Sequence, residues 1–188
     1  MIPANAEKQD FSISMLAANL YSLIIALPLC IGLLGVYALR RGTEQWLSSF
    51  HAIYTSPWFI LSIIVGVIVH ELLHAVGWRV FGHLAPGAVT FGIHLKTLTP
   101  YAHCTERLDI RAYRLGGLLP GLVLGFIPAA LGLITGNPWL INFGTLFTLA
   151  ASGDLLSLWL LRNVPKHSLI EDHPSRVGCY VYPARPHE

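Results

Sequence analysis

Residues 58–81, WFILSIIVGVIVHELLHAVGWRVF, join an apolar stretch of membrane-spanning length to the motif His70-Glu71-Leu72-Leu73-His74. Roughly 20 helical residues cross the hydrocarbon core of a bilayer. Two histidines four residues apart lie on one helix face, where both can reach a single Zn²⁺. Glu71 lies beside that face, where it can accept a proton from a water molecule that the metal activates. Because ionisable residues inside a membrane are costly and usually functional, the stretch predicts a metal centre within a membrane helix.

The composition is that of a membrane protein. Hydrophobic residues make up 54% of the 188 residues and charged residues 12%, whereas soluble domains carry about 25% charged residues. A formal net charge of +2 is too small to suggest nucleic-acid binding. The expected partners are therefore membrane lipid and a membrane-protein or peptide substrate. The sequence gives no indication of the oligomeric state.

We predict an all-α integral membrane protein, folded as a single polytopic membrane domain over residues 1–188. It has about four transmembrane helices and a small β-hairpin between the second and third. Arg40-Arg41-Gly42 ends the first helix, and Gly136-Asn137-Pro138 is a tight turn that makes the last two helices antiparallel. The first apolar run is too long for the core of a signal peptide, so we interpret it as a retained span. The predicted spans are residues 11–39, 58–81, 115–134 and 139–161.

The basic residues predict the orientation of these spans. Four spans place the N-terminus, the loop between the second and third spans and the tail from residue 162 to 188 on one side. That side holds ten of the 12 Lys and Arg residues, and the other side holds only Arg40 and Arg41. Because basic residues concentrate in cytoplasmic loops, we expect a multi-pass protein of the inner cell membrane with both termini in the cytoplasm.

The interfacial loop from residue 86 to 109 carries a different pattern. Apolar and polar residues alternate from Val89 to Leu95, which predicts a strand with one apolar face, and residues 97–104 can return as its partner. The tail after Arg162 is interpreted as an irregular, interfacial extension. Gly residues are frequent in the third span, which either permits close helix contacts or reflects their general frequency in membrane helices. They are Gly116, Gly117, Gly121, Gly125 and Gly132.

Two histidines do not complete a catalytic zinc site, which needs three protein ligands. Asp154 is the best third candidate, since it is the only acidic residue in the predicted third and fourth spans. His74 and Asp154 each lie seven residues before the predicted cytoplasmic end of their span, so both lie about 10 Å below the same surface. Gly153 leaves room beside Asp154 for another helix. The alternative role for Asp154 is a buried carboxylate paired with an arginine or a hydroxyl group.

Other histidines and the cysteines are interpreted as lying outside this centre. Among them, His103-Cys104 is the pair best able to bind a metal. The three cysteines are widely spaced and are expected to be free thiols facing a reducing compartment. His51 is expected on the far side of the membrane. Five histidines in the loops and tail are expected to be exposed or interfacial: His83, His94, His103, His167 and His173.

Several segments together resemble the zincin peptidases of bacterial membranes, which in turn are similar to site-2-type intramembrane zinc metalloproteases. The resemblance covers about residues 55–182. It implies that His70 and His74 bind zinc, that Glu71 is the catalytic glutamate, and that Asp154 is the third zinc ligand. The segments are His70–Ala75, Pro100–Cys104, Arg111–Arg114, Gly153–Leu155 and Asp172–Ser175. The chain differs from site-2 proteases in its Gly-Asp order at 153–154 and in the lack of an Asn-x-x-Pro element at Asn142.

The predicted function is zinc-dependent hydrolysis of peptide bonds in membrane-associated substrates, with Glu71 as general base. A substrate helix must unwind before it is cut, and the strand at 89–95 could hold the unwound segment as an added strand. One alternative is a membrane metal-binding or transport protein, against which the absence of inverted repeats argues. A second alternative is a catalytically inactive scaffold, against which the intact motif argues.

Overall fold

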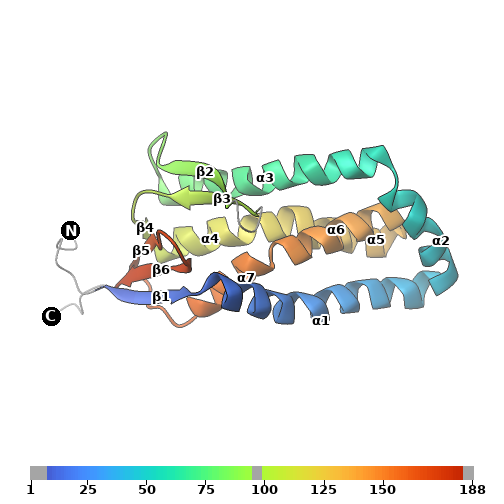
Figure 1. Ribbon diagram of the computed structural model, residues 1–188, viewed down its shortest axis with the longest axis horizontal. Coiled ribbons are helices and arrows are strands. Elements are labelled where there is room, and N and C mark those ends of the chain that lie inside the picture. The colour runs from blue at the N-terminus through green and yellow to red at the C-terminus, as the bar shows by residue number, and fades with distance from the viewer. Residues whose placement is uncertain (1–7, 95–98, 184–188) are drawn as a thin grey trace.

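The structure, a computed structural model, describes residues 8–94 and 99–183 and consists mostly of helices. Figure 1 shows the long helices side by side, with all strands gathered at one end, which we call the sheet end. The opposite end, with α2 and the turn at 136–138, is the turn end. The helices are α1 (Met15–Arg41), α2 (Thr43–Tyr54), α3 (Pro57–Gly82), α4 (Ile110–Pro120), the π-helical turn η1 (Gly121–Phe126), α5 (Ile127–Thr135), α6 (Pro138–Ala150) and α7 (Ser152–Leu160).

Three helical segments are long and apolar enough to cross a membrane: α1, α3 and the continuous run 110–135 formed by α4, η1 and α5. The pair α6–α7 also qualifies as one span, although the two helices are bent by 43°. The described residues therefore contain three to four candidate spans, compared with about four expected. Helix α1 begins at Met15, four residues later than predicted, and α3 extends the predicted range by one residue at each end.

Local signals fix the ends of the long helices. The Ser14 hydroxyl accepts a hydrogen bond from the backbone N–H of Ala17 and so caps α1. Gly42 ends α1 with a φ of 90°, a conformation that suits glycine. Helix α3 starts at Pro57, whose missing N–H costs nothing in a first turn. It ends at His83 in the left-handed region.

Two antiparallel sheets lie at the sheet end, so the all-α prediction is wrong there. One sheet has the order β1-β6-β5-β4. The other is the predicted hairpin, β2-β3, in which Phe91 faces Ala102 and Gly92 faces Tyr101. The strands are β1 (Gln9–Ile13), β2 (Val89–His94), β3 (Thr99–Cys104), β4 (Leu108–Asp109), β5 (Leu169–Asp172) and β6 (Val177–Tyr182). Leu95, the last residue of the predicted strand, lies outside the described residues.

The tail was predicted to be irregular. This prediction is wrong, because the tail supplies β5 and β6. A tight turn joins them, in which the ring Nδ1 of His173 accepts hydrogen bonds from the backbone N–H groups of Ser175 and Arg176. The first residues of the predicted first span instead form β1, which pairs with β6. The sheet packs on the helices through a buried apolar core at the sheet end. Its most buried members include Leu108, Ile110, Ile170, Cys179 and Val181.

Glycines allow the helices to approach closely, which is one of the two interpretations that the sequence left open for the third span. A Cβ placed on Gly77 would lie 2.7 Å from the Cα of Gly116, and one on Gly116 would overlap the Trp78 ring. A Cβ on Gly132 would lie 2.5 Å from the backbone N of Ile141. By contrast, a Cβ on Gly117 would make only ordinary contacts. Helices α3 and α4, and likewise α5 and α6, therefore touch backbone to backbone.

Replacing Gly132 by alanine should destabilise the protein by about 1–3 kcal/mol, because the new methyl group overlaps backbone atoms that cannot turn aside. Thermal unfolding in detergent micelles measures this as a lower Tm. Gly35→Ala is the matched control, since no atom lies within 4 Å of the place that its methyl group would take and alanine favours helix. An equal Tm for the two variants would contradict the tight contact between α5 and α6.

Candidate metal centre and active site

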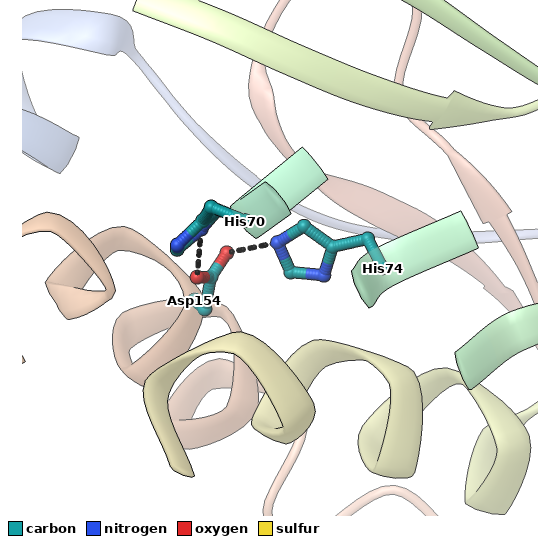
Figure 2. A group of neighbouring side chains, drawn as sticks. All are labelled: His70, His74 and Asp154. Carbon is teal, nitrogen blue, oxygen red and sulfur yellow. Dashed lines mark hydrogen bonds and ion pairs between the residues drawn. The ribbon is translucent and has the colours of Figure 1, made fainter. Parts of the chain in front are cut away.

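His70, His74 and Asp154 converge inside the helix bundle. The two histidines lie one turn apart on the inward face of α3, with only 8% and 6% of their surfaces exposed. Asp154 reaches them from α7, so that its carboxylate lies between the two rings (Figure 2). Its Oδ2 lies 3.1 Å from Nε2 of His70, and its Oδ1 lies 3.3 Å from Nε2 of His74. The structure thus brings together the three residues that the sequence suggested as ligands.

The break between α6 and α7 positions Asp154. The chain bends by 43° at Ala151, and Asp154 lies in the first turn of the new helix α7. The other end of α7 is held by Arg114 of α4, which donates hydrogen bonds to the carbonyls of Leu161 and Val164. Gly153 is not needed for a close approach, because a Cβ there would lie 4.0 Å from its nearest neighbour. The carboxylate contacts imidazoles, and not the arginine or hydroxyl group of the alternative role.

A second hydrogen bond fixes the ring of His74. Its Nδ1 lies 3.1 Å from the carbonyl oxygen of Gly116, and a carbonyl can only accept, so Nδ1 carries the proton. Nε2 is therefore the nitrogen that faces Asp154 and the one that could bind a metal ion. The His74 ring also stacks on Trp78, with 5.3 Å between ring centroids. Metal-binding histidines characteristically have such a partner on the second nitrogen.

The donor set fits a zinc ion. One ligand atom from each of the three residues can be chosen so that all lie within 4.8 Å of one another. Ligand atoms around tetrahedral zinc lie roughly 3.3 Å apart, given bonds of about 2.0–2.1 Å. The two histidine nitrogens lie 3.1 and 3.3 Å from different oxygens of Asp154, so all three side chains are close enough to share one ion. Two imidazoles and one carboxylate are also a ligand combination of catalytic zinc sites, which leave a fourth position open.

Glu71 lies on the adjacent face of α3, on the side of the hairpin. It is half-buried and interacts with the backbone of Ala102 in β3. It lines a pocket of about 380 Å³ between α3 and the hairpin. The other walls are almost entirely apolar. They include Val67, Ile68 and Leu72 of α3 and Phe91, Ile93 and Tyr101 of the hairpin. A single carboxylate thus faces an apolar pocket beside a candidate metal centre.

Asp172 of β5 holds the hairpin in place, a role that the sequence analysis missed. Its carboxylate accepts hydrogen bonds from the backbone N–H of Cys104, at 2.9 Å, and from the hydroxyl of Tyr113, at 2.8 Å. Nδ1 of His103 lies 3.5 Å from the same carboxylate. Burial raises the pKa of Asp172, and the two hydrogen bonds oppose that shift. The signal in the sequence was the Asp172–Ser175 segment, which only the resemblance singled out.

The remaining candidates take other roles. His103 is not simply exposed, because it pairs with Asp172. Cys104 is buried, burial raises the pKa of its thiol to about 11, and its Sγ donates to the carbonyl oxygen of Glu106. Neither residue joins the three candidate ligands. Cys30, Cys104 and Cys179 are all unpaired, as expected. His94 belongs to β2, but its side chain lies outside the described part of the chain.

Comparison with known proteins gives one match. The model of a family described as "Putative zincin peptidase" matches residues 63–169, more than half of the chain. The matched region contains α3, the hairpin and α7, and so includes all three candidate ligands and Glu71. No curated protein and no solved structure matches the chain.

Purified protein should contain one zinc per chain, and His70→Ala or Asp154→Ala should remove it, because each deletes one of three ligands. Metal analysis by mass spectrometry measures the content. His103→Ala is the matched control, since this histidine pairs with Asp172 and lies outside the centre. Full zinc content in both ligand variants would show that the three side chains do not bind the metal.

Proposed function

The chain belongs to the zincin peptidase family, and we propose that it is a membrane-embedded zinc metallopeptidase that hydrolyses peptide bonds of membrane-associated substrates. The observation that carries the proposal is the convergence of His70, His74 and Asp154 beside Glu71, which faces an apolar pocket. A transport path for ions offers no reason for such a pocket next to the carboxylate. The motif resembles that of site-2-type intramembrane proteases, although the Gly-Asp order at 153–154 and the missing Asn-x-x-Pro element differ. We extend the mechanism of those proteases to this chain.

His70, His74 and Asp154 would hold the zinc. A bound Zn²⁺ polarises a carbonyl group and lowers the pKa of water towards about 7. The protein's part is to fix the ligands. Gly116 and Trp78 fix the ring of His74, and Arg114 holds the end of the helix that carries Asp154. Rigid ligands of this kind keep a catalytic metal site in one geometry without further reorganisation.

Glu71 would act as the general base. Its carboxylate accepts a proton from the attacking water and then delivers that proton to the nitrogen of the leaving amine. Its place on α3, one residue after His70, puts it beside the metal centre without making it a ligand. The apolar walls of the pocket give Glu71 surroundings of low polarity, in which its interaction with a bound zinc ion would be stronger than in water.

The hairpin would present the substrate in an extended form. A peptide bond whose carbonyl is bonded within a helix cannot be attacked, so the substrate must unwind. Among the described residues, β2 and β3 pair only with each other, so the outer edge of β2 has no partner strand. The outer edge of β3 meets Glu71 and Asp172 instead. Strand β3 contacts α3, and its Ala102 meets Glu71. An unwound segment bound along the hairpin would therefore pass the general base.

The site would lie on the cytoplasmic side of the inner membrane. The first and last strands, β1 and β6, both lie at the sheet end (Figure 1). The sheet end also carries most of the basic residues, which are typical of the cytoplasmic side. His74 lies eight residues before the end of α3, which corresponds to a depth of about 12 Å. Water would reach this depth from the cytoplasm through the pocket at the sheet end.

Glu71→Gln should leave zinc bound but lower peptide cleavage by about 10²–10⁴-fold, because the amide cannot accept the proton of the attacking water. The assay is cleavage of an apolar model peptide in detergent, with zinc content measured on the same sample. A protein that uses Glu71 as an ion ligand would instead lose metal. Undiminished cleavage by Glu71→Gln would refute the assigned role.

Replacing residues 89–94 by a Gly/Ser linker of equal length should abolish cleavage, since the strand that pairs with β3 and lines the pocket is lost. Zinc content is the control and should stay at the wild-type level, because no candidate ligand lies in the hairpin. Normal cleavage by this variant would show that the hairpin does not present the substrate.

A further inference from the structure

Arg79 lies on the same stripe of α3 as Glu71, two turns closer to the sheet end. Glu71, Ala75 and Arg79 follow one another at four-residue spacing, and residues at this spacing share one helix face. Eight residues at 1.5 Å per residue separate the positions of Glu71 and Arg79 by about 12 Å along the helix. The proposed general base and a cation thus face the same side of α3.

Arg79 also lines a second pocket, of about 160 Å³, together with Ala75, residues 84–87 and Val89. Phe91 lines this pocket and the apolar pocket at Glu71. The two pockets therefore adjoin, and we call them together the α3 groove. It runs between α3 and β2, apolar beside Glu71 and cationic at the sheet end.

No residue of the described ranges 8–94 and 99–183 forms a hydrogen bond or ion pair with the guanidinium group of Arg79. Its residue is exposed, and none of the ion pairs within residues 8–94 and 99–183 involves it. By contrast, Arg107 and Arg176 pair with carboxylates and Arg114 binds backbone carbonyls. A cation in the last turn of a helix is favoured by the helix dipole. That effect accounts for the charge but not for the pocket around it.

We propose that the α3 groove selects an apolar peptide with an acidic side chain about four residues from the scissile bond, towards the sheet end, and that Arg79 binds this carboxylate. The proposal rests on the proposed function, because Glu71 marks the place of the scissile bond. An extended chain rises about 3.3 Å per residue, so roughly four residues cover the 12 Å between Glu71 and Arg79. Guanidinium and carboxylate groups form paired, charge-assisted hydrogen bonds.

The charges of the groove also explain why the acidic residue has one preferred position. A carboxylate close to Glu71 meets a like charge in apolar surroundings, which disfavours it. At Arg79 the carboxylate meets an opposite charge near the end of the helix, where the substrate leaves the apolar region. The groove therefore binds apolar residues beside Glu71 and favours an acidic residue only at Arg79, beyond Ala75.

Binding to the zinc-loaded Glu71→Gln protein tests the proposal without cleavage. The probes are fluorescent peptides with one apolar segment and a single Asp or Asn, moved stepwise from two to six residues beyond the bond that the wild type cuts. We expect Asp to lower the Kd about tenfold relative to Asn at the fourth position, as measured by anisotropy in maltoside micelles. The ratio should fall to about one when Arg79→Gln is added.

Two further variants sharpen the test. Arg79→Glu should invert the preference, so that a Lys peptide binds more tightly than the Asp peptide. Arg111→Gln is the matched control, because Arg111 is an exposed arginine of α4 that lines neither pocket. It should leave the tenfold ratio of Asp to Asn peptides unchanged.

Four results would overturn the proposal. They are no Asp preference at any position, an Asp preference that survives Arg79→Gln, an equal loss of affinity for the Asp and Asn peptides in Arg79→Gln, and an Asp preference that is seen in maltoside but absent in phosphatidylglycerol vesicles. The third result would give Arg79 a merely structural role, and the last would assign Arg79 to lipid phosphate. An Asp preference at the Arg79 end without cleavage by the wild-type protein would instead refute the peptidase function while supporting the acidic-peptide site. The two failures are therefore distinguishable.

Discussion

The contact of one carboxylate with two buried imidazoles organises the centre of this molecule. Asp154 lies within 3.3 Å of both rings, and an uncompensated carboxylate in such surroundings would be costly. The position of α7 along α3 and its rotation about its own axis are therefore fixed. The bend at Ala151 gives α7 its direction, and Arg114 fixes its far end. The backbone contact of Gly77 with Gly116 then brings the carbonyl that orients His74 within reach.

The same contact is linked to the sheets through a run of stacked rings. His74 stacks on Trp78, and Trp78 stacks on Tyr113 with 5.7 Å between centroids. The Tyr113 hydroxyl donates to Asp172, whose carboxylate also binds the backbone of the hairpin. The position of the hairpin over Glu71 is thereby tied to the position of the metal ligands. The tail strands thus help to shape the candidate site, since β5 supplies the carboxylate that joins the hairpin to the helices.

The sequence predicted what depends on local hydropathy and on the cost of buried charge. The helix carrying the motif and the partnership of Asp154 with His70 and His74 both followed from these two constraints. The sheet at the end of the bundle did not, because β1 pairs with β6 across more than 160 residues. Its first residues also continue directly into an apolar helix, which hides the strand. Helix α2 was missed because it is short and mixed in polarity, and the ion pair of His103 with Asp172 is visible only once the sheets are assembled.

The orientation of α3 determines how a peptide could approach. The spacing of the motif turns both histidines into the bundle and turns Glu71 towards the hairpin. The histidine side of α3 is covered by α4 and contacted by Asp154 of α7. On the Glu71 side, Ile68 and Leu72 are 58% and 47% exposed, and they line the same pocket as the glutamate. In the proposed function, an apolar segment would enter sideways from the bilayer and water would enter from the sheet end. Hydrolysis, which needs both an apolar substrate and water, would then occur where these two routes meet.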